Sequence, residues 1–166
     1  MKKKLLVLFA AVVCLAFAGV LAGCSSSGSS AASSSSSDSA SANRSYMSSA
    51  NTIIGQLQDN LTDFSDAVAK DDLVTMQATA KTAGENIDAF KKLTPPDQLK
   101  SVHEQYTKGC DQLKQALDDY ISLYADRKKS NISDSEFSSR LSTIQSEYDA
   151  GIAALQEGDK QATALK

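Results

Sequence analysis

The stretch VHEQYTKGCDQLKQALDDYISLY, residues 102–124, decides the fold of this chain. Apolar and aromatic side chains recur in it at alternating intervals of three and four residues, which places them on one stripe of an α-helix. The stripe consists of His103, Tyr106, Cys110, Leu113, Leu117, Tyr120 and Tyr124. Because a stripe of this length must be covered by other helices, the segment predicts one member of a helical bundle.

The segments on either side of this stretch repeat the same spacing, so four helices are predicted. The predicted helices are residues 46–69, 72–93, 95–129 and 134–157. Four amphipathic helices with short connections can cover their apolar stripes only by packing against one another. The sequence therefore predicts an all-α fold, an antiparallel four-helix bundle of up-down-up-down topology over residues 46–158. Residues 159–166 are expected to fray.

Local signals mark the start of two of these helices. Asp71 or Asp72 offers an N-cap for the second helix. No Gly or Pro marks that turn, so one long bent helix over residues 46–93 is the competing interpretation. Ser133 and Glu136 have the spacing of a capping box, which predicts the start of the fourth helix.

The connection LTPPDQ, residues 93–98, separates the second helix from the third. A residue that precedes proline avoids the helical region, and proline is favoured in the first turn of a helix. Thr94 is therefore expected to cap the third helix. The second helix has small residues in its middle, at Ala80, Ala83 and Gly84, which would let a neighbouring helix approach closely or would accommodate large side chains from across the bundle.

The first residues of the chain have the order of an export signal. Lys2, Lys3 and Lys4 precede an apolar run over residues 5–22. The run is too short for a comfortable transmembrane span, which needs about 20 apolar residues, and no positive cluster follows it. It ends at the tetrapeptide LAGC, residues 21–24.

The tetrapeptide Leu21-Ala22-Gly23-Cys24 resembles the lipobox of bacterial lipoproteins. In that class the Cys sulfur receives a diacylglycerol and the signal peptide is cut just before it. The resemblance implies that residues 1–23 are removed and that lipid on Cys24 holds the mature protein on the extracytoplasmic face of the cell membrane. Two or more acyl chains make such anchoring durable. An ordinary signal peptide cut elsewhere, or an uncleaved anchor, is the alternative.

A second, looser resemblance concerns the long helix. The segment LTPPDQLKSVHEQYTKGCDQLKQALDDY, residues 93–120, is similar to the Pro-led helix of many small helical lipoproteins of Gram-positive-type bacteria. The roles of those proteins are unassigned. This resemblance therefore implies an extracytoplasmic helical domain and transfers no functional site.

Residues 24–45 are rich in Ser, Ala and Gly and contain almost no large apolar side chains. A segment of this composition cannot bury enough apolar surface to offset the entropy lost on ordering. We therefore expect the lipidated Cys24 to be followed by a disordered linker that carries the bundle clear of the lipid headgroups.

The balance of charge limits the partners. The chain has 17 Lys and Arg residues and 20 Asp and Glu residues, and removal of three lysines with residues 1–23 leaves 14 against 20, a net charge of about −6. An acidic protein of this kind lacks the basic surface of a nucleic-acid-binding protein and should be repelled by nucleic acid and by anionic lipid. We expect no nucleic-acid partner.

Three residues of the third helix are candidates for binding a small ligand. His103, the only histidine, and Cys110 lie two turns apart on one helix face, about 10 Å along the axis, and Tyr106 lies between them. One shared metal ion would need further ligands from other helices. Haem ligation by one of them is an alternative, although no C-x-x-C-H motif is present. A hydrogen-bonded histidine beside an apolar cysteine is the simpler interpretation.

No pattern typical of a hydrolase is present, such as G-x-S-x-G or a Gly-rich loop, so we expect no enzymatic activity and no cofactor. Two functions remain. The first is a membrane-anchored envelope protein whose bundle binds another protein or an envelope polymer. The second is a small-ligand, haem or metal-binding bundle that uses the interior near His103 and Cys110. As a lone exported thiol, Cys110 could also link two copies of the chain into a homodimer.

Overall fold

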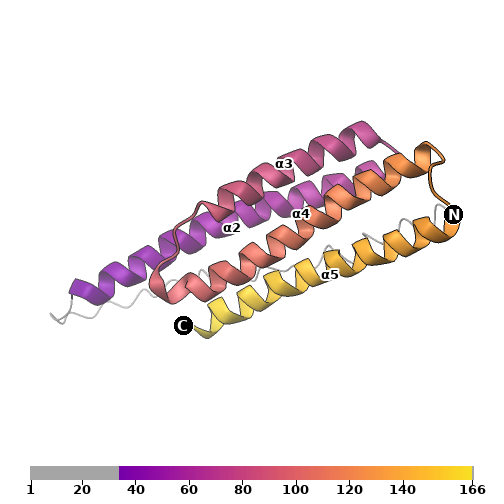
Figure 1. Cartoon of the computed structure of the whole chain (residues 1–166). Helices are drawn as coiled ribbons and strands as arrows, with labels where there is room; N and C mark the ends of the chain where they lie inside the picture. Colours follow the sequence, from indigo (N-terminus) through magenta and orange to yellow (C-terminus); the bar gives the residue numbers. More distant parts are fainter. Residues whose placement is uncertain (1–33, 166) are drawn as a thin grey trace.

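A computed structural model of the chain describes residues 34–165, with side chains from residue 39 (Figure 1). Four α-helices lie side by side along most of their length, and a short 3-10 helix, η1, precedes α4. Their bounds are α2 Ser34–Ala69, α3 Leu73–Lys91, η1 Asp97–Leu99, α4 Lys100–Lys128 and α5 Asp134–Ala164. The described residues contain no β-strand, which confirms the all-helical fold with four helices. The predicted signal peptide, the lipobox and Cys24 lie outside the described residues.

One end of the bundle, which we call the entry end, gathers residues 43–46 of α2, the end of α3, the start of α4 and the end of α5. The Tyr46 hydroxyl of α2 is hydrogen-bonded to Nδ1 of His103 in α4 at 2.9 Å. The ring of Phe90, in α3, is stacked on His103. Tyr106 donates a hydrogen bond to Asp159 in α5. The first turns of α4 therefore meet the last turns of α3 and α5, and they meet α2 at Tyr46, about three turns after α2 begins.

The opposite end gathers the two remaining connections, residues 70–72 and 129–133. Lys128 of α4 forms an ion pair of 2.8 Å with Asp71, which lies between α2 and α3. Arg127 likewise reaches Asp134 at the start of α5. These exposed pairs contribute little free energy each, but they show which residues lie at this end.

Two helices, not one bent helix, occupy residues 46–93. The turn between them is closed by Asp71, whose φ of 64° lies in the left-handed region that glycine usually supplies. The carbonyl O and Oδ1 of Asp71 both accept hydrogen bonds from the Tyr124 hydroxyl, which fixes this conformation. Asp72 then caps α3 by accepting from the backbone N–H of Thr75 at 3.1 Å.

The C-terminal part of the predicted linker, residues 34–45, needs correction. Helix α2 begins at Ser34, whereas the predicted linker runs to residue 45. No Gly or Pro interrupts residues 34–54. Alanine is the residue that favours a helix most, and serine lowers helix stability only moderately. Contacts at the entry end then hold the early turns, since Asn43 donates a hydrogen bond of 2.8 Å to Gln98. Contacts with distant residues therefore stabilise the first part of α2, and the amino-acid composition of the segment does not reveal them.

The C-terminal tail also differs from its prediction. Helix α5 continues to Ala164 instead of fraying after residue 158. Gly158 is buried, and Asp159 and Gln161 accept hydrogen bonds from Tyr106 and Ser101 of α4. Because these partners are far away in the sequence, the apolar spacing gave no sign of them.

The start of α4 corrects a third expectation. Thr94 does not cap the helix, because η1 lies between the prolines and α4 and neither of these elements has a side-chain cap. By contrast, Ser133 caps α5 as predicted and accepts from the backbone N–H of Glu136 at 3.2 Å.

Glycines set the closest contact between two helices, that of α4 with α5. A Cβ added to Gly109 would lie 2.8 Å from the carbonyl oxygen of Gly151. A Cβ added to Gly158 would lie 2.8 Å from the Tyr106 ring. At Gly84 the nearest atom would be Lys114 Cε at 3.7 Å, an ordinary contact. The close backbone approach at a glycine is therefore between α4 and α5, whereas Gly84 of α3 faces the long side chain of Lys114, the second possibility that the sequence left open.

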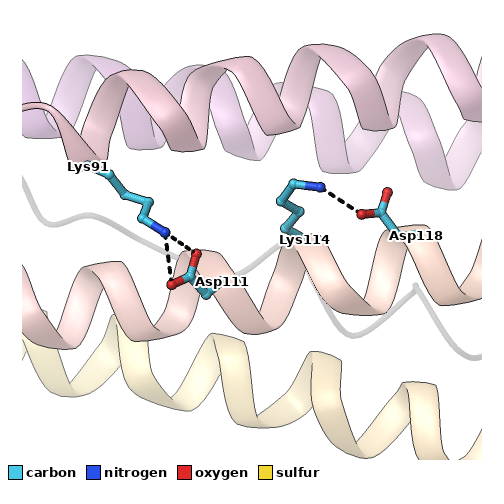
Figure 2. Close-up of polar contacts among 4 residues, drawn as sticks. All are labelled: Lys91, Asp111, Lys114 and Asp118. Atoms are coloured by element: carbon cyan, nitrogen blue, oxygen red, sulfur yellow. Dashed lines mark hydrogen bonds and ion pairs between the residues drawn. The ribbon is translucent and has the colours of Figure 1, made fainter.

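The apolar stripes of all four helices meet in one core, and α4 supplies three of its seven buried aromatic residues, more than any other helix. The largest fully buried side chains include Phe64, Phe90, Tyr106, Tyr120, Leu113 and Leu123. Outside the core, Lys91 of α3 reaches Asp111 of α4 with two contacts of 2.8 and 3.2 Å, whereas Lys114 pairs with Asp118 within α4 (Figure 2). Across residues 34–165, no helix has both the length and the apolar character that crossing a membrane requires.

Candidate functional site

The three candidate residues of the sequence, His103, Tyr106 and Cys110, lie in the first half of α4 and face the interior of the entry end. Their spacing of three and four residues puts them on one helix face, as the sequence predicts. The structure adds three neighbours from other helices, Tyr46, Phe90 and Asp159. We call these six residues the entry-end cluster.

His103 is half-buried and held by two aromatic side chains. Its ring is stacked on Phe90, with 5.0 Å between ring centres and 18° between the planes. Its Nδ1 is 2.9 Å from the Tyr46 hydroxyl. Burial lowers the pKa of His103, while the charge of Glu104 acts in the opposite direction. The imidazole is therefore neutral at pH 7, and one of its two ring nitrogens is already engaged.

Tyr106 is buried and directs its hydroxyl to α5. The hydroxyl donates a hydrogen bond of 2.5 Å to Oδ1 of Asp159. Burial raises the pKa of Asp159, although the hydrogen bond from Tyr106 acts in the opposite direction. Burial also raises the pKa of Tyr106, so the phenol stays protonated and remains a donor. This pair links the start of α4 with the last turns of α5.

Cys110 lies in the core with no exposed surface. Burial raises the pKa of its thiol to about 12, and the charge of Asp111 adds to the shift. Burial likewise raises the pKa of the Tyr46 hydroxyl to about 12. A nucleophile or a metal ligand must be a thiolate, so the thiol of Cys110 is inert in this conformation. A disulfide between two copies through Cys110 would require the core to open.

The side chains of the entry-end cluster are not arranged as the ligands of a metal centre. Within residues 39–165, no three or more His, Cys, Asp or Glu side chains are grouped so that they could hold a metal ion. Nδ1 of His103 and the hydroxyl of Tyr106 are directed to Tyr46 and Asp159 within the fold. The arrangement suits the joining of helices rather than the binding of an ion.

Two surface depressions lie outside the core. The larger, of about 580 Å³, is open to solvent and runs along α4; its described lining residues are His103, Glu104, Thr107, Lys108, Asp111 and Gln112. The smaller, of about 210 Å³, lies where α2 ends and α3 begins. Asp63 and Asp66 of the acidic face of α2 border the smaller depression, and Lys70 lies beside them. Neither encloses a ligand-sized volume with walls from several helices, which is typical of a binding pocket.

Sequence reasoning missed three members of the cluster for different reasons. Tyr46 lies at the predicted start of its helix, and Asp159 lies in the segment that was expected to fray. Phe90 belongs to the apolar stripe of the second predicted helix, but its partner His103 could not be identified from spacing.

Comparison with known protein families gives one match. A family of unknown function, DUF6376, matches residues 40–154. The chain belongs to this family. The DUF6376 match begins within α2, ends within α5 and includes all three candidate residues of α4 but not Asp159. No curated protein and no solved structure matches the chain.

The DUF6376 match covers part or all of each of the four helices. The description of the family attaches no activity, ligand or partner to the matched residues. Any function has to be argued from the chain's own residues.

Proposed function

We propose that this chain is a cell-envelope lipoprotein, anchored to the extracytoplasmic face of the cell membrane by lipid on Cys24. The observation that carries the proposal is the tetrapeptide Leu21-Ala22-Gly23-Cys24, which follows three lysines and an apolar run. A lipid anchor places a protein on a membrane without a transmembrane helix. Residues 24–33 would then connect the lipid to α2, and this length of chain spans at most about 35 Å.

The bundle of this lipoprotein is proposed to be a non-catalytic module that binds an envelope protein or an envelope polymer. The support is the state of the candidate residues. His103 is bonded to Tyr46, Tyr106 to Asp159, and the Cys110 thiol is buried and protonated. An active site needs a nucleophile or a base that can reach a substrate, and these groups are occupied within the fold.

The proposed topology is up-down-up-down, with neighbouring helices antiparallel. Two sets of contacts support it: Tyr46–His103 and Tyr106–Asp159 at the entry end, and the Asp71–Lys128 ion pair at the other. Connections of three to eight residues between successive helices favour the same arrangement. The lipid-anchored connection then joins the bundle at the entry end.

The haem or metal-binding alternative near His103 and Cys110 is left out of the proposal. Ligation by Cys110 would require a buried thiol with a raised pKa to ionise and reach an ion. Ligation by His103 through Nδ1 would displace the Tyr46 hydroxyl. Titration of the purified protein with haemin, followed by absorbance, tests this directly: we expect no Soret shift.

The lipid anchor is tested by metabolic labelling with an alkyne fatty acid in a bacterial host. We expect label on the full chain and on a Cys110→Ala variant, but none on a Cys24→Ala variant. The Cys110→Ala variant is the matched control, because it removes the other cysteine of the mature chain and leaves the lipobox intact. Label that persists on Cys24→Ala, or that is absent from the wild-type chain, would overturn the proposal.

A further inference from the structure

The turn between α2 and α3, residues 70–72, is closed by a non-glycine residue in the left-handed conformation. The backbone N–H of Asp72 donates to the carbonyl of Ala67 at 3.0 Å, and that of Asp71 donates to the carbonyl of Val68 at 3.2 Å, the pattern of a Schellman motif. Asp71, with a φ of 64°, holds the position that is usually glycine in this motif. Because a side chain makes this conformation unfavourable, the short turn is strained.

The conformation of Asp71 depends on a helix outside the α2–α3 hairpin. The Tyr124 hydroxyl of α4 donates to the carbonyl O and to Oδ1 of Asp71. Lys128 of α4 forms an ion pair of 2.8 Å with Oδ2 of Asp71, and its Nζ lies 5.3 Å from the centre of the Tyr124 ring. Contacts between helices therefore stabilise the strained turn, and they are lost when the hairpin separates from α4.

The sequence of the turn is compatible with a continuous helix. Residues 56–83 contain no glycine and no proline. Ala69 and Lys70 favour a helix, and an aspartate at 71 or 72 disfavours it only moderately. The local signal for a new helix is the cap that Asp72 provides at the start of α3. The break between α2 and α3 is thus weakly encoded in the local sequence and depends on α4.

The connection between α4 and α5 is a poorer place for a continuous helix. It has five residues, 129–133, where the α2–α3 turn has three. Its last four residues are Ser, Asn, Ile and Ser, which favour a helix less than Ala or Lys. Straightening of the chain is therefore more favourable at residues 70–72.

A chain with a straightened turn can regain its lost contacts from a second copy. One continuous helix over residues 34–91 is about 87 Å long, so its two halves cannot pack on each other. The first half can instead take the place of α2 in the second copy. The hydrogen bonds Asn60–Asn86 and Tyr46–His103 then form between copies with the geometry of the monomer. Such an exchange needs no new complementary surface, which makes it a low-cost route to a dimer.

We infer that residues 70–72 are a hinge through which two copies of this chain exchange α2 and form a symmetric dimer. Short hinge loops under strain favour such an exchange, whereas Tyr124 and Lys128 favour the closed chain, in which α2 lies beside α3 (Figure 1). The two bundles of the dimer meet at the ends that hold the hinge. The inference concerns the bundle alone and does not depend on the proposed lipid anchor.

The exchange is tested with a pair of cysteines across α2 and α3. Asn86 donates a hydrogen bond of 2.8 Å to Asn60, so Asn60→Cys with Asn86→Cys places two thiols close together. In the full chain, refolded from denaturant at rising concentration, a short bismaleimide links this pair. A closed monomer gives a link within one chain, and the exchanged dimer gives a link between two chains, which a denaturing gel separates. The two single variants control for links that involve Cys24, Cys110 or chance collision.

Two substitutions of Asp71 in this background test the hinge itself. Asp71→Ala and Asp71→Gly remove the same contacts with Tyr124 and Lys128 but differ in backbone preference. Alanine disfavours the left-handed turn and favours a helix, and glycine does the reverse. We expect the ratio of interchain to intrachain product to be at least about tenfold higher for Asp71→Ala than for Asp71→Gly. Tyr124→Phe, which leaves the turn residues unchanged, should also raise this ratio above that of the chain with the cysteine pair alone.

The outcomes separate exchange from ordinary association. An interchain product of the cysteine pair that grows with concentration supports the hinge. Intrachain links alone at every concentration would overturn it, even in a chain that dimerises. Equal ratios for Asp71→Ala and Asp71→Gly would also overturn it. If circular dichroism shows that Asp71→Ala has lost its helices, the comparison of Tyr124→Phe with the parent pair decides in its place.

Discussion

Gly109 of α4 and Gly151 of α5 face each other so closely that a methyl group on Gly109 would lie 2.8 Å from the carbonyl oxygen of Gly151. In return, a Cβ on Gly151 would lie 3.0 Å from the carbonyl oxygen of Gly109 and 2.9 Å from Leu113. Backbone therefore packs on backbone at this crossing. The absence of a side chain, and not a particular side chain, sets the distance between α4 and α5.

Replacement of Gly109 by alanine should destabilise the protein. The added methyl group meets backbone, which cannot move aside as a flexible side chain would, so α4 and α5 must separate. Overpacking of this kind costs about 1–3 kcal/mol, which exceeds the gain of about 0.5–1 kcal/mol that alanine brings to a helix interior. Chemical denaturation of the full chain, followed by circular dichroism, measures the change in the free energy of unfolding.

Gly55→Ala is the matched control for this substitution. Gly55 is also inside a helix, but a Cβ there would meet no atom within 4 Å. This variant should be more stable than the wild-type chain by about 0.5–1 kcal/mol. Equal effects of Gly109→Ala and Gly55→Ala would show that α4 and α5 are not in close backbone contact.

Replacement of Tyr106 by phenylalanine should destabilise the entry end by about 1–2 kcal/mol at pH 7. The change removes the hydroxyl that donates to Asp159 and leaves a half-buried carboxylate without that donor. Gln161→Ala, which removes the exposed contact with Ser101 one turn away, should cost much less. The free energies of unfolding of the two variants decide whether the Tyr106–Asp159 pair holds α5 in place.

The pH dependence of the same pair has a defined sign. Burial raises the pKa of Asp159 in the folded chain above that of the unfolded chain, so the folded state binds this proton more tightly. Ionisation of Asp159 therefore lowers the free energy of unfolding as the pH rises from about 4, the usual pKa of an aspartate, through the raised value. Asp159→Asn keeps an acceptor for Tyr106 and should abolish this part of the pH dependence. An unchanged profile would contradict the assignment.

His103 should contribute a pH dependence of stability in the opposite direction. Its pKa is lowered by burial, so the unfolded chain binds the proton more readily than the folded one. Its contribution to stability is present above about pH 6.5, the usual pKa of a histidine, and is lost as the pH falls below that value. Denaturation at several pH values should show this loss in the wild-type chain and not in His103→Gln. Loss of equal size in both would point to another group.

Cys110 should not react with a thiol reagent while the protein is folded. The sulfur has no exposed surface and the pKa of the thiol is raised to about 12, so the reactive thiolate is scarce. In a disulfide-exchange assay, Cys110→Ala serves as the blank, and the difference between it and the wild-type chain should appear only in denaturant. Rapid reaction of the native protein, or a disulfide-linked dimer of it, would mean that the core opens at Cys110.

The sequence predicts the helices well where their signals are local. The 3,4 spacing gives four helices, and the caps at Asp72 and Ser133 are found as expected. It fails at the start of α2 and at the end of α5, because Asn43 is held by Gln98 of η1 and Asp159 by Tyr106 of α4, more than 50 positions away in each case. Thr94 fails as a cap because two prolines lead into a 3-10 turn first.

The sequence predicted only those residues of the candidate site that lie on one helix, again because local spacing says nothing about contacts between helices. His103, Tyr106 and Cys110 share a helix face, which spacing alone determines. Their partners belong to three other helices, and only the packing of the bundle brings them together. The sequence also gave no sign of the close contact between Gly109 and Gly151. From local sequence alone, a glycine within a helix indicates only a less favourable free energy of helix formation.

The mass of the N-terminal peptide of the protein, purified from the membranes of a bacterial host, tests the account most directly. The account predicts a peptide that begins at Cys24 and carries a diacylglyceryl group on its sulfur, with or without a further acyl chain on its amino group. A mature chain that begins at any other residue, or an unmodified Cys24, would contradict it.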